Sequence, residues 1–194
     1  RDMMAWTFGN REFEGDSQRT SLTRKMILRF EEILAINPNL SAAAQMNGDG
    51  ETVIASVSKN RTGITQVSEE LRAVLEESTK IYPAFQWVPG DVLGEDEVLS
   101  KAVEEPAVLG IRSIGRSGRA EEDSFIILSI SEERIRRCYE SVVYNGSQAV
   151  LLDENNRVIS STKEGLLYQE FEPEKDCRIV VYPLSYNNWT MVNM

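Results

Sequence analysis

Residues 46–56, with the sequence MNGDGETVIAS, and residues 151–161, with the sequence LLDENNRVISS, each place a polar turn between two apolar runs. This arrangement is typical of a β-hairpin. Hairpin turns look alike in unrelated proteins, so the two strings alone establish little. Each hairpin, however, follows a segment in which apolar residues have helical spacing, so the same order of elements occurs twice. The sequence therefore predicts an α+β fold built from a duplicated module.

Three segments carry apolar residues at three- and four-residue spacing, which predicts amphipathic helices. The first covers residues 21–36 and stops at residues 37–38, Asn-Pro. The second starts at Thr65 and ends near Tyr82, because the proline that follows disfavours helix in the residue before it. The third begins after Ser131, a favourable N-cap residue, and closes at residues 145–146, Asn-Gly.

Apolar runs elsewhere predict further strand pairs. Residues 107–114 and 124–130 are expected to be central strands, and residues 177–184 and 188–193 are expected to form a closing hairpin. Residues 83–101 instead carry aromatic residues, two prolines, two glycines and an acidic run. This composition predicts a long loop that crosses the surface.

The composition excludes several classes of function. The chain has 194 residues, 21 Lys and Arg against 31 Asp and Glu, a formal net charge of −10 and no histidine. Without an imidazole it lacks the usual general base and most zinc sites, so no catalytic, metal or cofactor site is expected. The negative charge repels phosphate backbones, so nucleic acid is not an expected partner. The length predicts one domain or two small modules.

Cys138 and Cys177 are too few for a disulfide scaffold and do not make a metal-binding set. Two interpretations stay open: two unlinked thiols, or one bridge that would indicate an oxidising compartment.

The order of elements resembles the tandem PAS-like sensor regions called double Cache domains, which lie outside the membrane in bacterial histidine kinases and chemoreceptors. No single motif is specific, and the resemblance depends on the order of segments over nearly the whole chain. These segments are the helix before Asn37, the hairpin at 45–56, the strands VLGIRSI (108–114) and SFIILSI (124–130), the helix SEERIRRCYESVV (131–143), and the second module from AVLLDENNRVISS (149–161) to NWTMVN (188–193).

The resemblance implies two PAS-like modules, each an antiparallel sheet with flanking helices, on a long N-terminal helix. Residues 1–36 would be the upper part of that helical spine, 37–130 the membrane-distal module, 131–145 a linking helix and 146–194 a smaller membrane-proximal module. In this family a strand with a tryptophan closes the second module shortly before a transmembrane helix, and Trp189 matches that strand. The region is therefore expected to be extracytoplasmic, in a parent chain anchored in the cell membrane.

The resemblance also implies a function. The region would sense a signal for a two-component histidine kinase, and the phosphoryl chemistry would lie elsewhere in the parent chain. The expected partner is a small-molecule ligand, including carbohydrates because many such kinases accompany carbohydrate uptake, or a ligand-loaded solute-binding protein. A homodimer is expected for the full-length protein. The alternatives are the ligand-binding domain of a methyl-accepting chemoreceptor and a cytoplasmic PAS-type interaction domain.

The candidate ligand-binding residues are Tyr82, Phe85, Trp87, Asp91 and Arg112. The first four supply aromatic faces and a carboxylate within ten residues, and Arg112 interrupts an otherwise apolar strand. Aromatic faces stack on sugar rings or cationic groups, and arginine binds carboxylates through two hydrogen bonds. The alternative is that the aromatic residues belong to the core and that Arg112 lies on a solvated sheet face.

One subset of double Cache domains binds amino acids through an arginine two residues before a tryptophan, with tyrosines on either side. In the matching segment here, YPAFQWVPGD at residues 82–91, Phe85 stands in place of the arginine and Val88 in place of the second tyrosine. The clamp for the aminocarboxylate group is missing, which disfavours amino acids as ligands.

Overall fold

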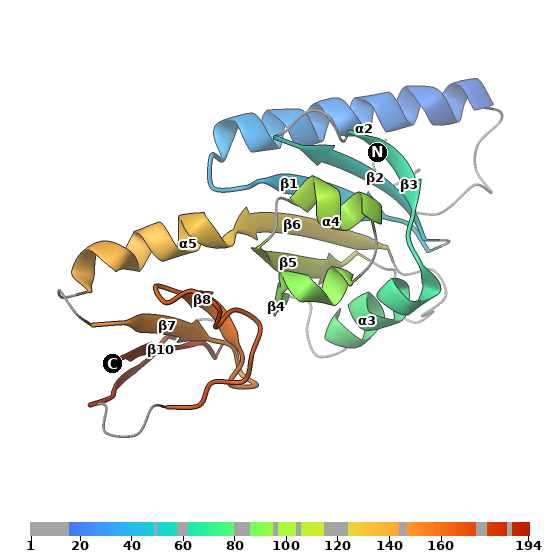
Figure 1. The fold of residues 1–194 in the computed structure, drawn as a ribbon. Coiled ribbons are helices and arrows are strands. Elements are labelled where there is room, and N and C mark those ends of the chain that lie inside the picture. Colours follow the sequence, from blue (N-terminus) through green and yellow to red (C-terminus); the bar gives the residue numbers. More distant parts are fainter. Residues whose placement is uncertain are drawn as a thin grey trace.

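The computed structural model describes residues 16–48, 50–57, 62–79, 86–94, 97–103, 106–114, 124–143, 147–173, 178–185 and 188–194. These residues form an α+β fold with two antiparallel sheets (Figure 1). The larger sheet has six strands in the order β3-β2-β1-β6-β5-β4, and the smaller has four in the order β8-β7-β10-β9.

The described helices are α2 (Asp16–Ile36), α3 (Glu69–Thr79), α4 (Glu97–Val103) and α5 (Glu132–Tyr139), with the 3-10 helices η2 (Gly90–Leu93) and η4 (Glu140–Val142). The strands of the larger sheet are β1 (Ala42–Met46), β2 (Glu51–Ser56), β3 (Gly63–Gln66), β4 (Gln86–Pro89), β5 (Ala107–Ser113) and β6 (Phe125–Ser131). Those of the smaller sheet are β7 (Ala149–Leu152), β8 (Val158–Ser161), β9 (Val180–Pro183) and β10 (Thr190–Asn193).

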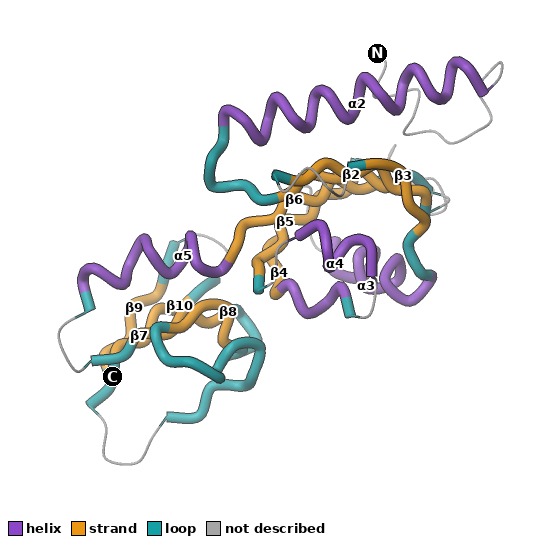
Figure 2. Tube along the Cα trace, turned by 45° about the horizontal axis from the view of Figure 1, so that its top comes forward, coloured by secondary structure: helices purple, strands orange, loops and turns teal. Residues whose placement is uncertain are grey.

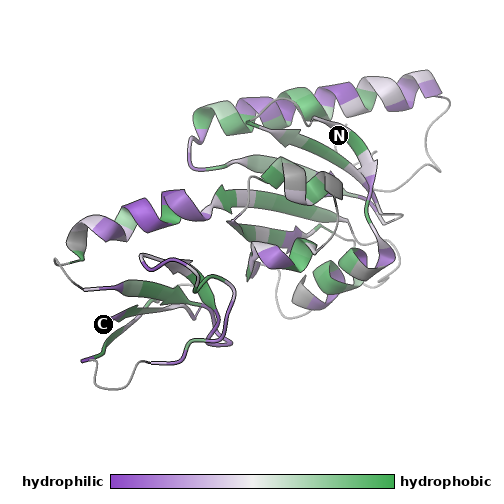
Figure 3. Ribbon diagram, in the orientation of Figure 1, coloured by the Kyte–Doolittle hydropathy of each residue, from purple (hydrophilic) through white to green (hydrophobic). Residues whose placement is uncertain are grey.

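The larger sheet is covered on both faces. Figure 2 shows α2 along one face and α3 and α4 on the other. Helix α2 turns Met26, Phe30 and Leu34, four residues apart, onto the sheet. Beneath them Ala43 and Ala55 are directly paired across β1 and β2, and these small side chains belong to the same buried cluster. Buried apolar residues of the central strands belong to two clusters, one beneath α2 and one beneath α3 and α4, and Figure 3 shows these strands largely in green.

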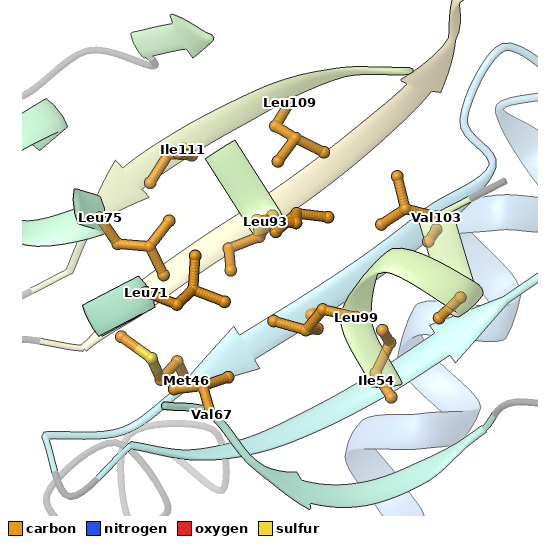
Figure 4. Packing of buried hydrophobic residues seen from close by; sticks show 14 of the residues in the cluster. Met46, Ile54, Val67, Leu71, Leu75, Leu93, Leu99, Val103, Leu109 and Ile111 are labelled. Carbon is orange, nitrogen blue, oxygen red and sulfur yellow. The ribbon is translucent and has the colours of Figure 1, made fainter. Parts of the chain in front are cut away.

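The main core lies between the sheet and helices α3 and α4. Figure 4 shows leucines from three separate elements, Leu71 on α3, Leu93 on η2 and Leu99 on α4, around one set of strand residues. Each of the three is at most 3% exposed. Phe125 at the start of β6 completes the cluster. This face of the larger sheet is closed by tightly packed apolar side chains.

Several sequence predictions are confirmed. Helix α2 matches the first predicted helix but begins five residues earlier, at Asp16 instead of 21. The hairpin at residues 46–56 is β1 and β2, closed by a hydrogen bond from the Asn47 amide to the Glu51 carbonyl at 2.9 Å. Strands β5 and β6 pair inside the sheet, and the later segments form β7 with β8 and β9 with β10.

The predicted start of the second helix is wrong. Residues 63–66 form β3, in which Thr65 pairs with Thr52 of β2, and α3 begins only at Glu69. The Ser68 hydroxyl accepts a hydrogen bond from the Leu71 amide at 3.1 Å, which caps the helix at this point. Pairing with β2 therefore overrides the helical spacing that the sequence shows from Thr65.

The predicted long loop at residues 83–101 is also wrong over its described part. Strand β4 pairs with β5, with Val88 opposite Leu109, and η2 and α4 follow. These elements contain four to seven residues each, too few to show a periodic pattern in the sequence.

The third predicted helix is shorter than expected. Helix α5 ends at Tyr139 and is followed by the 3-10 turn η4. Ser131 occupies the N-cap position, but its side chain makes no capping hydrogen bond. The amide of Glu132 instead donates to the carbonyl of Pro106 at 2.8 Å.

Two further observations concern the membrane and the cysteines. No helix in the described part of the chain is long and apolar enough to span a bilayer. Cys138 is an exposed free thiol, and Cys177 lies outside the described residues.

The packing of α3 can be tested by a pair of neighbouring substitutions. Leu75 is fully buried in the main core, whereas Val74 is 39% exposed. We expect Leu75→Ala to lower the free energy of unfolding by about 2 to 5 kcal/mol, because it leaves a cavity. Val74→Ala should change it by less than about 0.5 kcal/mol. Equal losses in urea denaturation would contradict the described packing of α3 on the sheet.

Candidate functional site at the junction of the two sheets

The two sheets meet at an apolar junction built from distant parts of the chain. Val108 of β5, Leu151 of β7 and Ile159 of β8 form its buried centre. The half-buried side chains Trp87, Ile135, Trp189 and Met191 pack around them. The junction therefore joins strands of both sheets to helix α5.

Two tryptophan rings contact each other across this junction. The rings of Trp87, on β4, and Trp189, just before β10, have centroids 6.3 Å apart and an angle of 73° between their planes. This edge-to-face arrangement is favoured by the charge distribution of aromatic rings and contributes about 0.5 to 1.5 kcal/mol beyond burial. Gly110, which has no side chain, lies opposite Trp87 in the β4–β5 ladder.

Tyr168 forms a polar contact between the sheets. Its hydroxyl accepts a hydrogen bond from the Ala107 amide at 2.8 Å and donates one to the Ala107 carbonyl at 3.1 Å. Tyr168 has a φ of 65°, which is uncommon outside glycine and is held here by these contacts. A Cβ atom at Gly90 would lie 2.7 Å from the Ala107 carbonyl oxygen. Glycine at position 90 is therefore required for this close approach.

An ion pair lies at the edge of the junction. Arg157, in the β7–β8 hairpin, binds the carboxylate of Asp91 in η2. The same guanidinium donates to the Tyr168 carbonyl at 3.1 Å. Both side chains are about one third exposed, at 33% and 35%. Exposed ion pairs add little to the free energy of unfolding, so we infer that this pair mainly orients η2 against the β7–β8 hairpin.

Helix α5 is anchored to β8 by a buried polar network. One carboxylate oxygen of Glu132 accepts hydrogen bonds from the Ser160 hydroxyl at 2.7 Å and from the Ser161 amide at 3.2 Å. The Tyr139 hydroxyl lies 2.7 Å from the Ser160 hydroxyl. Arg136 lies 3.6 Å from the other Glu132 oxygen. The carboxylate is only 7% exposed. Its partners on both oxygens offset the cost of burying its negative charge.

Burial in this network raises the pKa of Tyr139 to about 12. Loss of hydration is the main cause, the Ser160 hydrogen bond opposes it, and the negative charge of Glu132 adds to it. The phenol therefore stays protonated in the folded state well above the pH at which free tyrosine ionises.

The structure describes three of the five predicted ligand-binding residues. Trp87 lies in the junction and Asp91 binds Arg157 at its edge. Arg112 is exposed on β5, opposite Ile126 of β6 and two residues along the strand from Gly110, which pairs with Trp87. Tyr82 and Phe85 lie outside the described residues. The proposal that the five residues form a ligand site stays a prediction.

Sequence reasoning missed most of the junction. Arg157 and Tyr168 follow ordinary turn patterns, and Glu132 belongs to a charged run that looks solvated. The one available signal was the serine pair at 160 and 161, polar residues at the end of an apolar strand. No group of three or more Cys, Asp or Glu side chains in the described ranges is placed to hold a metal ion.

The junction contacts can couple the positions of the two sheets.

No protein-family model matches the sequence, and no curated protein matches it. Solved structures match over nearly the whole chain. One is the extracellular domain of a protein assigned as a histidine kinase, rpHK1S-Z16, with a TM-score of 0.60 and 10% identity over 98% of this chain and 80% of that one. Another is the sensor domain of the Vibrio cholerae histidine kinase DctB, with a TM-score of 0.53 and 12% identity over 91% and 80%.

A chemoreceptor has the same fold. The ligand-binding domain of Campylobacter jejuni Tlp3, solved in complex with 4-methylisoleucine, matches with a TM-score of 0.59 and 9% identity over 100% of this chain and 78% of that one. At these identities the likeness concerns the fold. The chain has the α+β fold of extracellular sensor domains from histidine kinases and chemoreceptors.

The buried carboxylate can be tested against its exposed neighbour. We expect Glu132→Gln to lower the free energy of unfolding by about 2 kcal/mol, because hydrogen bonds to a buried charge are replaced by weaker ones. Glu133, whose side chain is 57% exposed, provides the control substitution Glu133→Gln with little effect. Urea denaturation of both variants measures the difference. Similar values for both would contradict the anchoring role of Glu132.

The raised pKa of Tyr139 predicts loss of stability at high pH. Above pH 10 the unfolded chain ionises this tyrosine while the folded chain keeps it protonated to about pH 12, so the contribution is complete below pH 10 and lost as pH rises. We expect the loss to be on the order of 2 kcal/mol by pH 12.

Unfolding is compared at pH 9, below both pKa values of Tyr139, and at about pH 11.5, between them, and the Tyr139→Phe variant separates this contribution from those of other groups that titrate in the same range. In Tyr139→Phe the pH-dependent part should shrink, although the variant is less stable at neutral pH because a hydrogen bond is lost. Tyr182→Phe, on the 52% exposed Tyr182, is the control. An unchanged pH dependence in Tyr139→Phe would refute the assignment.

Proposed function

We propose that this chain is the extracytoplasmic signal-sensing region of a membrane-bound sensor histidine kinase, with the double Cache arrangement of two PAS-like modules. The observation that carries the proposal is the match to sensor domains over 91% to 100% of this chain, which includes both sheets. The chain forms a six-stranded sheet first and a separate four-stranded sheet after it, which supports a two-module sensor over a single isolated PAS-type domain.

The proposed modules follow the sheets. Residues 37–130 would be the membrane-distal module and contain five of the strands of the larger sheet and nearly all of the sixth. Residues 146–194 would be the membrane-proximal module and contain the smaller sheet. Residues 131–145 would link them through α5, and residues 1–36 would supply the helical spine through α2.

The proposed mechanism is a ligand-dependent shift between two packings of the junction. Strand β6 continues directly into α5 at Ser131, and α5 is bonded to β8 through Glu132. A displacement of β6 in the distal module therefore moves the proximal sheet as well. A ligand biases this equilibrium only by its difference in affinity for the two states. The kinase reaction itself would occur in the cytoplasmic part of the parent chain.

The proposed input is a small molecule. The Tlp3 domain was solved with an amino-acid derivative, whereas this chain has Phe85 and Val88 where an amino-acid clamp would need arginine and tyrosine. The ligand screen therefore includes carbohydrates and organic acids as well as amino acids. A ligand-loaded solute-binding protein is the other proposed input. A homodimer of the parent chain is part of the proposal, because kinases of this class act as dimers.

A chemoreceptor is the second candidate for the output. The TM-score of the Tlp3 domain, 0.59, is nearly the same as the 0.60 of the rpHK1S-Z16 domain, so the likeness favours neither output. A cytoplasmic PAS-type interaction domain is the third, and it requires a parent chain without a membrane helix beside this region. The cytoplasmic sequence of the parent chain distinguishes all three.

A ligand screen with a junction reporter tests the sensory function. At a concentration of about 100 times its Kd, a ligand should raise the melting temperature by about 5 to 10 °C. The chain has three tryptophans, so Trp6→Phe leaves Trp87 and Trp189 as the only indole reporters. We expect a binder from the sugars, organic acids or amino acids to shift this emission, and a non-binding stereoisomer to leave it unchanged.

Two results count against this mechanism. The first is a saturating ligand that leaves both the junction emission and the amide exchange of α5 unchanged, because sensing requires the junction to respond. The second is the absence of any thermal shift across these compound classes and with candidate solute-binding proteins.

A further inference from the structure

The smaller sheet carries a pocket on the face away from the junction. Its floor is formed by Leu152 of β7 and Val192 of β10. Along these strands they alternate with Leu151 and Met191, which pack into the junction. Because alternate residues of a strand point to opposite faces, the pocket and the junction use opposite sides of the same sheet.

The pocket has the size and apolar lining of a small-molecule site. Its volume is about 420 Å³, within the range of roughly 300 to 1,000 Å³ typical of ligand pockets. Leu152 and Val192 are 3% and 2% exposed, and Phe171 and Ile179 form partly buried walls. An apolar group of a few carbon atoms fits against this floor.

Its polar rim is negative. Asp153 and Glu154, at the β7–β8 turn, both line the pocket, and no lysine or arginine lines it within the described residues. Arg157, the cation nearest to Asp153 and Glu154 along the chain, is bound to Asp91 and to the Tyr168 carbonyl. Neither Asp153 nor Glu154 forms an ion pair with any part of the chain that the structure describes. Among the residues that the structure describes, no cationic side chain therefore neutralises the negative charge of the rim.

Asp153 supplies an available acceptor at the rim. The residue is only 7% exposed. Its hydrogen bonds, from the amides of Asn155 at 2.8 Å and Arg157 at 2.9 Å, both use the oxygen Oδ1. These bonds fix the carboxylate in the turn and leave Oδ2 to accept from a bound molecule. A buried carboxylate fixed by backbone amides favours a charged donor over a neutral one.

We propose that this pocket binds a small organic ammonium ion. The Asp153 and Glu154 carboxylates would hold the ammonium group, and the apolar body would lie on Leu152 and Val192. The Phe171 ring, among the wall residues, would offer its face to the same positive charge. The site lies in the smaller sheet, apart from the ligand site predicted on the larger one, and would be a second input to the junction from its opposite side.

Three probes of one shape separate charge from apolar fit. They are 3-methylbutylamine, its neutral analogue 3-methylbutanol and its negative analogue 3-methylbutanoate. We expect the amine to bind the intact chain in calorimetric titration at least about tenfold more tightly than the alcohol, and the carboxylate not to bind. Equal affinity for amine and alcohol overturns the proposal, and so does the absence of amine binding.

A pair of substitutions on β9 locates the binding. Val181 lines the pocket and pairs with Val192, whereas Val180 pairs with Asn193 on the other face. Both are exposed, at 55% and 38%. Val181→Lys places a positive charge at the pocket and should reduce amine affinity at least about tenfold. Val180→Lys adds the same charge to the same strand outside the pocket and should bind as the unmodified chain does.

Glu154→Gln provides a second measure, because Glu154 is exposed and its replacement leaves the Asp153 turn intact. It should weaken amine binding and leave alcohol binding unchanged. Equal effects of Val180→Lys and Val181→Lys would overturn the pocket as the site. These outcomes concern the pocket alone, because the sensory function is judged separately by the ligand screen and the junction emission.

Discussion

The position of the smaller sheet depends on Glu132. Its backbone amide is bonded to Pro106 beside the larger sheet, and its carboxylate is bonded to Ser160 and Ser161 of the smaller sheet. A buried carboxylate is costly unless its oxygens are compensated, so few placements of α5 against β8 satisfy it. Because β6 leads into α5 without a loop, this single residue relates the two sheets in space.

The junction contacts further fix the position of the smaller sheet against the larger one. The tryptophan pair supplies a directional apolar contact, the Tyr168 hydroxyl satisfies both polar groups of Ala107, and Arg157 orients η2. The two sheets thus share contacts of three physical kinds, each with its own geometric requirement. Closely packed contacts of this kind favour discrete packings over continuous deformation, as the proposed relay would require.

The smaller sheet presents different chemistry on its two faces. One face carries the apolar junction and the anchored helix, and the other carries a pocket with an apolar floor and two carboxylates that form no ion pair within the described residues. The net charge of −10 does not predict this pocket, because most of the acidic residues lie elsewhere in the chain. Strand alternation places the two surfaces back to back across one layer of backbone. A change at one surface therefore has a short path to the other.

Local periodicity and turn chemistry were enough to predict the α+β class, the helix over residues 21–36 and the hairpins, because these features depend on residues close together in the chain. Trp87 was identified as notable from its residue type, but its partner Trp189 lies about one hundred residues later, and no local pattern joins them. The pairing of Asp91 with Arg157, the burial of Glu132 and the formation of β3, β4 and α4 became visible only in the folded chain. Each of these depends on contacts between residues far apart in the chain, and burial and pairing at such distances overrule the propensities of short segments.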